Sequence, residues 1–91
     1  MHLTWPPKTV DENLDYQLDW TDALEGNTIS ISTWDLITES NTLTLGSNAL
    51  TPTATEVRLI GGSPGYATVR NTVVLNDGQT MVADVKILIR I

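Results

Sequence analysis

Residues 67–91 read ATVRNTVVLNDGQTMVADVKILIRI, and this segment gives the clearest indication of the fold. Apolar residues recur at every second position on both sides of a polar NDG segment, which is the pattern of two strands that each bury one face. If the DG pair alone formed the turn, Val73 would lie opposite Val82 and the apolar faces would not coincide. A three-residue NDG loop instead pairs Val73 with Met81. The pattern therefore predicts a hairpin with the longer loop and with Gly78 in the left-handed region.

The segments before this hairpin also have strand patterns, separated by glycine- and proline-containing connections. The expected strands are Leu14–Trp20, Thr28–Leu36, Thr42–Leu45 and Thr55–Ile60, and the expected loops and turns are Thr21–Asn27, Gly46–Asn48 and Gly61–Gly65. In one strand the apolar residues change from odd to even positions: Ile29 and Ile31 would point to one face of the sheet, and Trp34 and Leu36 to the other. A strand of period two needs an extra residue to do this, so we expect a β-bulge near 32–33.

The composition agrees with an all-β domain of modest size. Threonine, valine and isoleucine make up 28 of the 91 residues, and these β-branched side chains suit a pleated sheet better than a helix. Phenylalanine and cysteine are absent, so three tryptophans and two tyrosines supply all the aromatic side chains and no disulfide can form. We expect Trp20 and Trp34 in the core. Residues 11–91 are predicted to form an antiparallel immunoglobulin-like β-sandwich of about seven strands.

The first ten residues are expected to behave differently from the rest of the chain. Pro6 and Pro7 have fixed φ angles and no N–H groups, so residues 1–10 are predicted to form an extended arm instead of a strand within a sheet. Such an arm is too short to build its own core, and Trp5 can bury its indole only against the domain or against a partner. Trp5, Pro6 and Pro7 are therefore the candidate partner-binding residues.

Charge and hydropathy argue against several classes of partner. Eleven acidic and five basic residues give a formal net charge of −6, whereas nucleic acids and anionic membrane surfaces attract basic patches. No apolar run approaches the roughly 18 residues of a membrane span, and the start of the chain lacks the basic-then-apolar order of a signal peptide. We expect neither a nucleic-acid nor a membrane partner.

Catalytic, cofactor-binding and metal-binding residues are not predicted. His2 is the one histidine, and nothing in its proline-containing segment orients it as a catalytic base. Asp15 and Asp19 share a strand face but lie roughly 13 Å apart along an extended strand, too far to share a proton or a metal ion. A calcium site at Asp22, Glu25 and Asn27 is a weak alternative, because the loop lacks the ladder of carboxylates that such sites use.

Several short motifs together resemble a known family. In order, they are Leu14-Asp15-Tyr16 with Asp19-Trp20, Thr28-Ile29-Ser30 with Ser32-Thr33-Trp34, Val57-Arg58-Leu59 with Gly61-Gly62, Val69-Arg70-Asn71-Thr72-Val73, and Asp77-Gly78-Gln79-Thr80. Their order and spacing are similar to those of small immunoglobulin-like proteins of tailed phages and prophages that are described as fibre–tail adaptors. The resemblance runs from about Pro7 to Ile91. It departs at Ala67, where similar sequences place an aromatic residue that here is shifted to Tyr66.

The resemblance implies a function without chemistry. Such proteins are non-enzymatic structural components of a virion that dock tail and fibre components to each other, without catalytic residues or cofactors. Their partners are other virion proteins (tail, fibre or capsid subunits), and we expect several copies in a symmetric assembly that forms in the host cytoplasm. Two alternatives stay open: a capsid decoration protein with the same fold, and a carbohydrate-binding module that uses exposed tryptophans.

Overall fold

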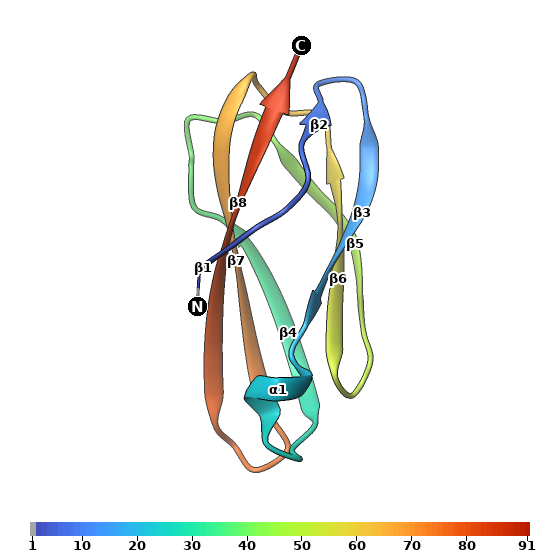
Figure 1. Cartoon of the computed structure of the whole chain (residues 1–91), viewed down its shortest axis with the longest axis vertical. Coiled ribbons are helices and arrows are strands. Elements are labelled where there is room, and N and C mark those ends of the chain that lie inside the picture. Colours follow the sequence, from blue (N-terminus) through green and yellow to red (C-terminus); the bar gives the residue numbers. More distant parts are fainter. Residues whose placement is uncertain (1) are drawn as a thin grey trace.

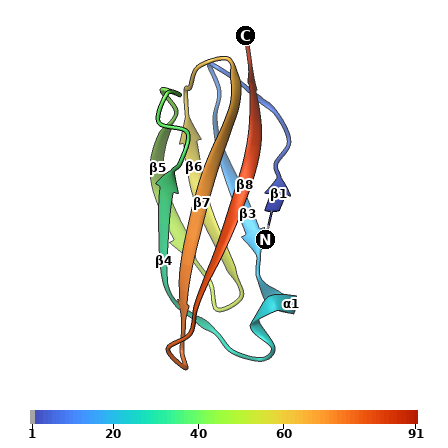
Figure 2. The same ribbon diagram turned by 90° about the vertical axis from the view of Figure 1, so that its left-hand side faces the viewer.

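The computed structural model describes residues 2–91, which form eight strands and one short helix. The elements are β1 His2–Thr4, β2 Lys8–Thr9, β3 Asn13–Asp19, α1 Thr21–Leu24, β4 Ile29–Leu36, β5 Thr44–Leu50, β6 Ala54–Ile60, β7 Gly65–Leu75 and β8 Thr80–Arg90. Two sheets pack face to face as a sandwich (Figures 1 and 2). Sheet A contains β1, β2, β4, β7 and β8, and sheet B contains β3, β5 and β6.

The strand order is that of an immunoglobulin-like sandwich. Sheet B runs β3-β6-β5 and the main part of sheet A runs β8-β7-β4, which match the B-E-D and G-F-C strands of such domains. These neighbours are all antiparallel, whereas β1 and β2 pair in parallel with β8. The predicted fold class is confirmed, with eight strands in place of about seven.

The hairpin of β7 and β8 has the predicted register. Val73 lies opposite Met81 and Val69 opposite Val85. Leu75 N–H donates to Gln79 O at 2.8 Å, and Gly78 has a φ of 91°. The need to place both apolar faces on the same side of the sheet therefore selects the three-residue loop over the tighter turn.

The bulge in β4 is real but lies earlier than expected. The register shifts between Ile29 and Ile31, not near residues 32–33. Ile29 is consequently buried while Ile31 is 56% exposed on the outer face of the sheet. The alternation of apolar residues required an extra residue somewhere between Ile29 and Trp34, and it did not fix the position.

The segment predicted as a turn at Gly46–Asn48 is instead part of β5. The register of β5 against β6 shifts between Leu45 and Asn48, so these residues form an irregularity within the strand. A Cβ atom at Gly46 would lie 2.8 Å from Ile60 Cδ1, and the glycine thus permits close approach of β6. The actual turn is at residues 51–54, where Thr51 N–H donates to Ala54 O at 2.9 Å.

A buried polar network joins the two sheets around Trp20. Its indole is 1% exposed, and Nε1 donates to Thr55 Oγ1 at 3.1 Å and to Asn71 Oδ1 at 3.2 Å. Asn71 Nδ2 in turn donates to Ser32 Oγ and to the carbonyl of Thr33. The expectation that Trp20 lies in the core is confirmed.

Trp34 packs against the core from β4 and is only partly buried. It occupies the strand that carries the buried tryptophan of immunoglobulin domains. Within residues 2–91 its Nε1 atom is buried without a hydrogen-bond partner. The prediction that both tryptophans lie in the core is therefore fully correct for Trp20 and partly correct for Trp34.

The predicted loop at Thr21–Asn27 contains the single turn of α1. The turn ends at Glu25, which has a φ of 50°, and at Gly26, which has a φ of 89°. No helix in the described part of the chain has the length and apolar character needed to cross a membrane.

Candidate docking surfaces

The N-terminal segment, residues 2–10, is part of the sandwich. β1 pairs with residues 84–86 of β8 and β2 pairs with residues 89–90 (Figure 1). Trp5 N–H also donates to Lys86 O at 3.0 Å. The expectation that this segment stays outside the sheet is wrong for β1 and β2. The two prolines interrupt the ladder only where they stand, because the residues on either side still have N–H groups.

The indole of Trp5 fills the space between β8 and β3. It is 7% exposed, stacks on Tyr16 with ring centroids 5.0 Å apart, and lies 5.8 Å from the ring of Trp34. Nε1 donates to the carbonyl of Gln17 at 3.1 Å. In the isolated chain this residue packs against its own domain, so any direct contact of the indole with a partner would require its release.

Pro6 and Pro7 are exposed next to the buried indole. Tyr16 Oη donates to Pro6 O at 3.1 Å, which fixes the path of the prolines over the side of the sandwich. Burial, with a smaller contribution from the charge of Glu12, raises the pKa of Tyr16 above its usual value of 10.0, so the phenol stays a donor at neutral pH. Contact of Pro6 and Pro7 with another chain stays a prediction.

Lys8 is a buried residue that sequence reasoning did not single out. Its side chain is 1% exposed, and the ammonium donates to Thr9 O at 2.7 Å and to Gly61 O. Desolvation lowers the pKa of Lys8, while the charges of Glu12 and Asp11 oppose this shift. The ammonium thereby ties the N-terminal segment to the connection between β6 and β7. No local pattern marks a lysine for burial, because its partners are carbonyl groups that any residue can supply.

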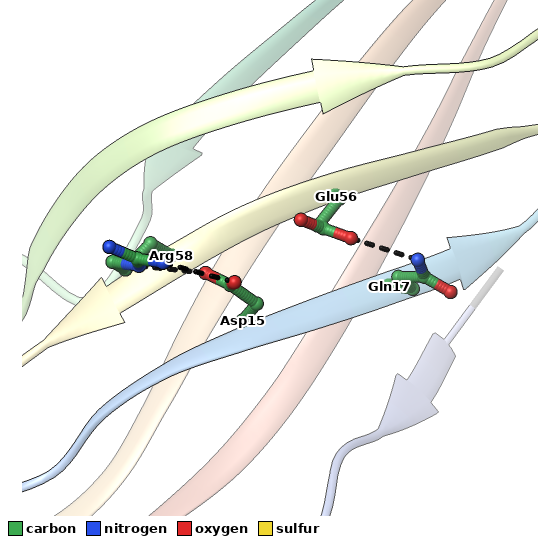
Figure 3. Close-up of polar contacts among 4 residues, drawn as sticks. All are labelled: Asp15, Gln17, Glu56 and Arg58. Carbon is green, nitrogen blue, oxygen red and sulfur yellow. Dashed lines mark hydrogen bonds and ion pairs between the residues drawn. The ribbon is translucent and has the colours of Figure 1, made fainter.

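The outer face of sheet B carries two polar pairs that join β3 to β6 (Figure 3). Arg58 forms a two-pronged ion pair with Asp15, with Nε–Oδ1 at 2.8 Å and Nη2–Oδ2 at 3.2 Å, and Gln17 Nε2 donates to Glu56 at 2.8 Å. Each pair lies directly opposite across β3 and β6. The hydrogen bond from Arg58 lowers the pKa of Asp15. These four side chains thus find their polar partners within the chain itself.

The outer face of sheet A carries exposed apolar side chains. Eight large hydrophobic residues are exposed in the described chain, and four of them lie on this face: Ile31, Ile37, Tyr66 and Val82. None of the eight lies on the outer face of sheet B. Leu14 and Leu50 belong to this sheet, but they lie opposite the buried Leu59 and Thr55 on its inner side and are exposed because they stand near strand ends. Of the two outer faces, only that of sheet A therefore carries exposed large apolar side chains, which makes it the candidate docking surface.

The shifted aromatic residue contributes to the same face. Tyr66 is 60% exposed on the outer face, while its neighbour Ala67 is buried. Lys86 Nζ lies 5.0 Å from the centroid of the Tyr66 ring. Tyr66 thus adds an exposed aromatic ring to the outer face of sheet A.

A groove of about 340 Å³ lies beside Lys86 and is lined by Leu3, Thr4, Thr68, Asp84 and Lys86.

A row of charged residues crosses this outer face. Arg70 of β7 forms a two-pronged ion pair with Asp84 of β8, at 2.8 and 3.1 Å, and lies opposite Asp35 of β4 on its other side. The hydrogen bond that Arg70 donates to Asp84, together with the charge of this carboxylate, raises the pKa of Arg70, with a smaller contribution from Asp35. The row therefore alternates in sign from β8 to β4, where it ends with a carboxylate.

The expectation that the chain has no catalytic or metal-binding residues stays a prediction. Among residues 2–91, no three histidine, cysteine, aspartate or glutamate side chains come together closely enough to hold a metal ion. Asp22 and Glu25 of the weak calcium alternative are thus not members of any such group. The side chain of His2 lies outside what the structure describes, and the expectation about it stays a prediction.

Comparison with solved structures finds the same fold in unrelated settings. The cysteine protease inhibitor EhICP2 from Entamoeba histolytica has a TM-score of 0.57 and 16% identity, over 98% of this chain and 93% of that one. A 2,6-sialyltransferase from Photobacterium sp. JT-ISH-224 has a TM-score of 0.58 and 12% identity, over 97% of this chain but only 18% of the enzyme. At these identities the likeness shows the fold alone.

Comparison of the sequence with protein families gives a more specific result. Comparison with curated protein sequences finds no match. The model of the family described as podophage GP4 fiber-tail adaptor protein gp77 matches residues 8–88, which is nearly the whole sandwich and excludes Trp5, Pro6 and Pro7. The resemblance inferred from the ordered motifs is confirmed. The chain belongs to this family of podophage fibre-tail adaptor proteins, which are structural components of the virion.

Proposed function

We propose that this chain is a non-enzymatic docking module that joins a tail component to a fibre component of the virion, mainly through the outer face of sheet A. The family match over residues 8–88 carries the proposal. The distribution of exposed apolar side chains supports the choice of surface, because four of the eight lie on the outer face of sheet A and none lies on the outer face of sheet B, where Arg58 pairs with Asp15 and Gln17 with Glu56. The family match also favours the tail over the capsid, and nothing in the structure favours the decoration alternative.

The carbohydrate-binding alternative loses its motivation in the structure. It required tryptophans that present a ring to solvent for stacking on a sugar. Trp5 and Trp20 are 7% and 1% exposed, and Trp34 packs against the core from β4. The exposed aromatic ring that we assign to docking is Tyr66 instead.

The N-terminal segment supplies a second contact in this proposal. Pro6 and Pro7 form a rigid, exposed ridge, which loses little conformational entropy when a partner binds. Trp5 would act indirectly, because its buried indole holds the ridge against β3. Several copies around a symmetric tail would each present the same two surfaces.

Particles assembled without this chain test the proposed function. We expect a phage deleted for the gene to form heads and tails that lack fibres, as seen by electron microscopy, and the wild-type chain to restore them. The Ile37→Lys/Val82→Lys variant should not restore fibres although it folds, because both positions are exposed on sheet A. Gln17→Lys/Ala49→Lys is the matched control, since it adds the same charge to sheet B, and it should restore them.

Two results would contradict the proposal. Fibres on particles that lack the chain would show that it does not join fibre to tail. Equal restoration by both double variants would show that the outer face of sheet A is not the docking surface. Circular dichroism of each purified variant establishes that the comparison is made between folded proteins.

A further inference from the structure

The lateral edges of the two sheets differ in how well they are covered. In sheet A the edge of β8 is occupied by β1 and β2, and in sheet B the carbonyl of Gln17 at the edge of β3 accepts a bond from Trp5. The edge of β5 is broken by its register shift between Leu45 and Asn48. β4 pairs only with β7 and keeps a continuous register from Ile31 to Leu36. Figure 2 shows β4 on the side of the sandwich opposite the N-terminal segment.

The backbone of β4 presents unpaired groups along this edge. Ile37 N–H donates to Thr68 O at 2.9 Å, so the backbone at Ile37 points toward β7. Because these directions alternate in an antiparallel pair, Ser32, Trp34 and Leu36 direct their N–H and C=O groups away from β7. No other strand of the described chain takes them. An edge with such a row of free donors and acceptors is a template for another strand, and β4 has no proline or lysine to prevent pairing.

The side chains on the outer face of β4 define what that strand should carry. The charged row from Asp84 through Arg70 ends at Asp35, which has no ion pair within residues 2–91. A cation opposite Asp35 would continue the alternation of sign. Ile31 and Ile37, on the same face, are 56% and 41% exposed and would be covered by apolar side chains at the corresponding positions.

We propose that the open edge of β4 receives an extended segment of a tail or fibre protein as an additional antiparallel strand. The segment places a lysine or arginine opposite Asp35 and apolar side chains opposite Ile31 and Ile37. Antiparallel addition is chosen because it is slightly more stable per residue than parallel addition. The identity of the partner as a virion protein rests on the proposed function, whereas the position and chemistry of the edge rest on the structure.

Two synthetic peptides test this proposal on the whole chain. One has the sequence Val-Thr-Lys-Thr-Thr-Thr-Val with blocked ends, which places its lysine opposite Asp35 and a valine opposite Ile31 and Ile37. The second peptide has glutamate in place of lysine. In heteronuclear NMR titrations at millimolar concentration, the lysine peptide should shift the amide signals of Ser32 and Leu36 and slow their hydrogen exchange. The glutamate peptide should bind about 2- to 30-fold more weakly, since a cross-strand attraction becomes a repulsion.

Charge variants of the chain identify the residue that determines the preference for the lysine peptide. Asp35→Arg should reverse the preference, so that the glutamate peptide binds more tightly. Asp22→Arg, an equal change of charge at an exposed position on α1, should leave the preference for lysine unchanged. Amide shifts centred on β3 or β5, equal affinity for both peptides, or no shift in β4 would overturn the proposal.

The outcomes of this experiment and of the particle experiment are separable. If particles without the chain lack fibres but neither peptide perturbs β4, the edge proposal fails and the docking function stands. If the lysine peptide binds β4 with the expected preference while particles without the chain keep their fibres, the edge is a strand-binding site and the fibre-tail function fails.

Discussion

Replacing Trp5 with alanine removes the side chain that connects the N-terminal segment to both sheets. Loss of a buried tryptophan costs about 3–5 kcal/mol, and with the indole 7% exposed nearly all of its surface is involved. The ring contacts with Tyr16 and Trp34 account for about 1–2 kcal/mol and the bond to the Gln17 carbonyl for about 1 kcal/mol. We expect a loss near the low end, about 3 kcal/mol, because a segment at the side of the sandwich can partly settle into the space.

Urea denaturation followed by far-ultraviolet circular dichroism measures this loss without depending on tryptophan fluorescence. Trp5→Phe keeps most of the apolar contact and loses the hydrogen bond, so it should cost about 1 kcal/mol. Leu3→Ala is the control in the same segment and should cost about 1 kcal/mol or less, since Leu3 is 37% exposed. A loss below about 1 kcal/mol for Trp5→Ala would contradict this role of the indole, because the segment would then behave as the separate arm that the prolines suggested.

Three further perturbations address the other buried and paired groups. Lys8→Met should lower the free energy of unfolding, measured by urea denaturation, by about 1–3 kcal/mol, because it leaves the Gly61 carbonyl without its donor. An unchanged urea midpoint would contradict the stabilising role of the Lys8 ammonium. Asn71→Ala should lower the free energy of unfolding by about 2–4 kcal/mol and lower the melting temperature in calorimetry, since it removes the hydrogen bonds that link Trp20 to β4. A loss under about 1 kcal/mol would show that the fold does not depend on this network. The lowered pKa of Asp15 means that its pair stabilises the fold above the unfolded value of 3.8 and that this contribution is lost as the pH falls below it. Asp15→Asn should therefore flatten the acid limb of a stability–pH profile measured with urea, and an unaltered limb would be the contrary result.

The parts of the fold that follow from alternation were predictable from the sequence. The pairing of Val73 with Met81 depends only on which residues are apolar, because a slip of one residue would turn a whole face outward. The existence of the bulge in β4 could be predicted, but its position could not. The register shift lies between Ile29 and Ile31 instead of near residues 32–33, and Ile31 therefore points outward and is exposed. Gly46 was misread as a turn because a glycine that permits close packing has the same local signal as one that permits a bend.

The docking surfaces were less predictable, because they depend on contacts between distant parts of the chain. β1 pairs with β8 across some eighty residues of sequence, and a parallel partner leaves no local pattern in a three-residue strand. Burial of Lys8 and Trp5 depends on the same pairing. The proline ridge was found because proline has a strong local signal, whereas the alternating charge row through Arg70 requires the register of three strands at once.

The most direct measurement is electron cryomicroscopy of an intact phage particle that carries this chain, at a resolution that places individual strands. We expect the sandwich at the junction of tail and fibre, with Tyr66, Ile37 and the β4 edge covered by a neighbouring chain and the Asp15–Arg58 pair facing solvent. The chain bound to the capsid lattice, or docked through the Asp15–Arg58 face with β4 exposed, would contradict this expectation.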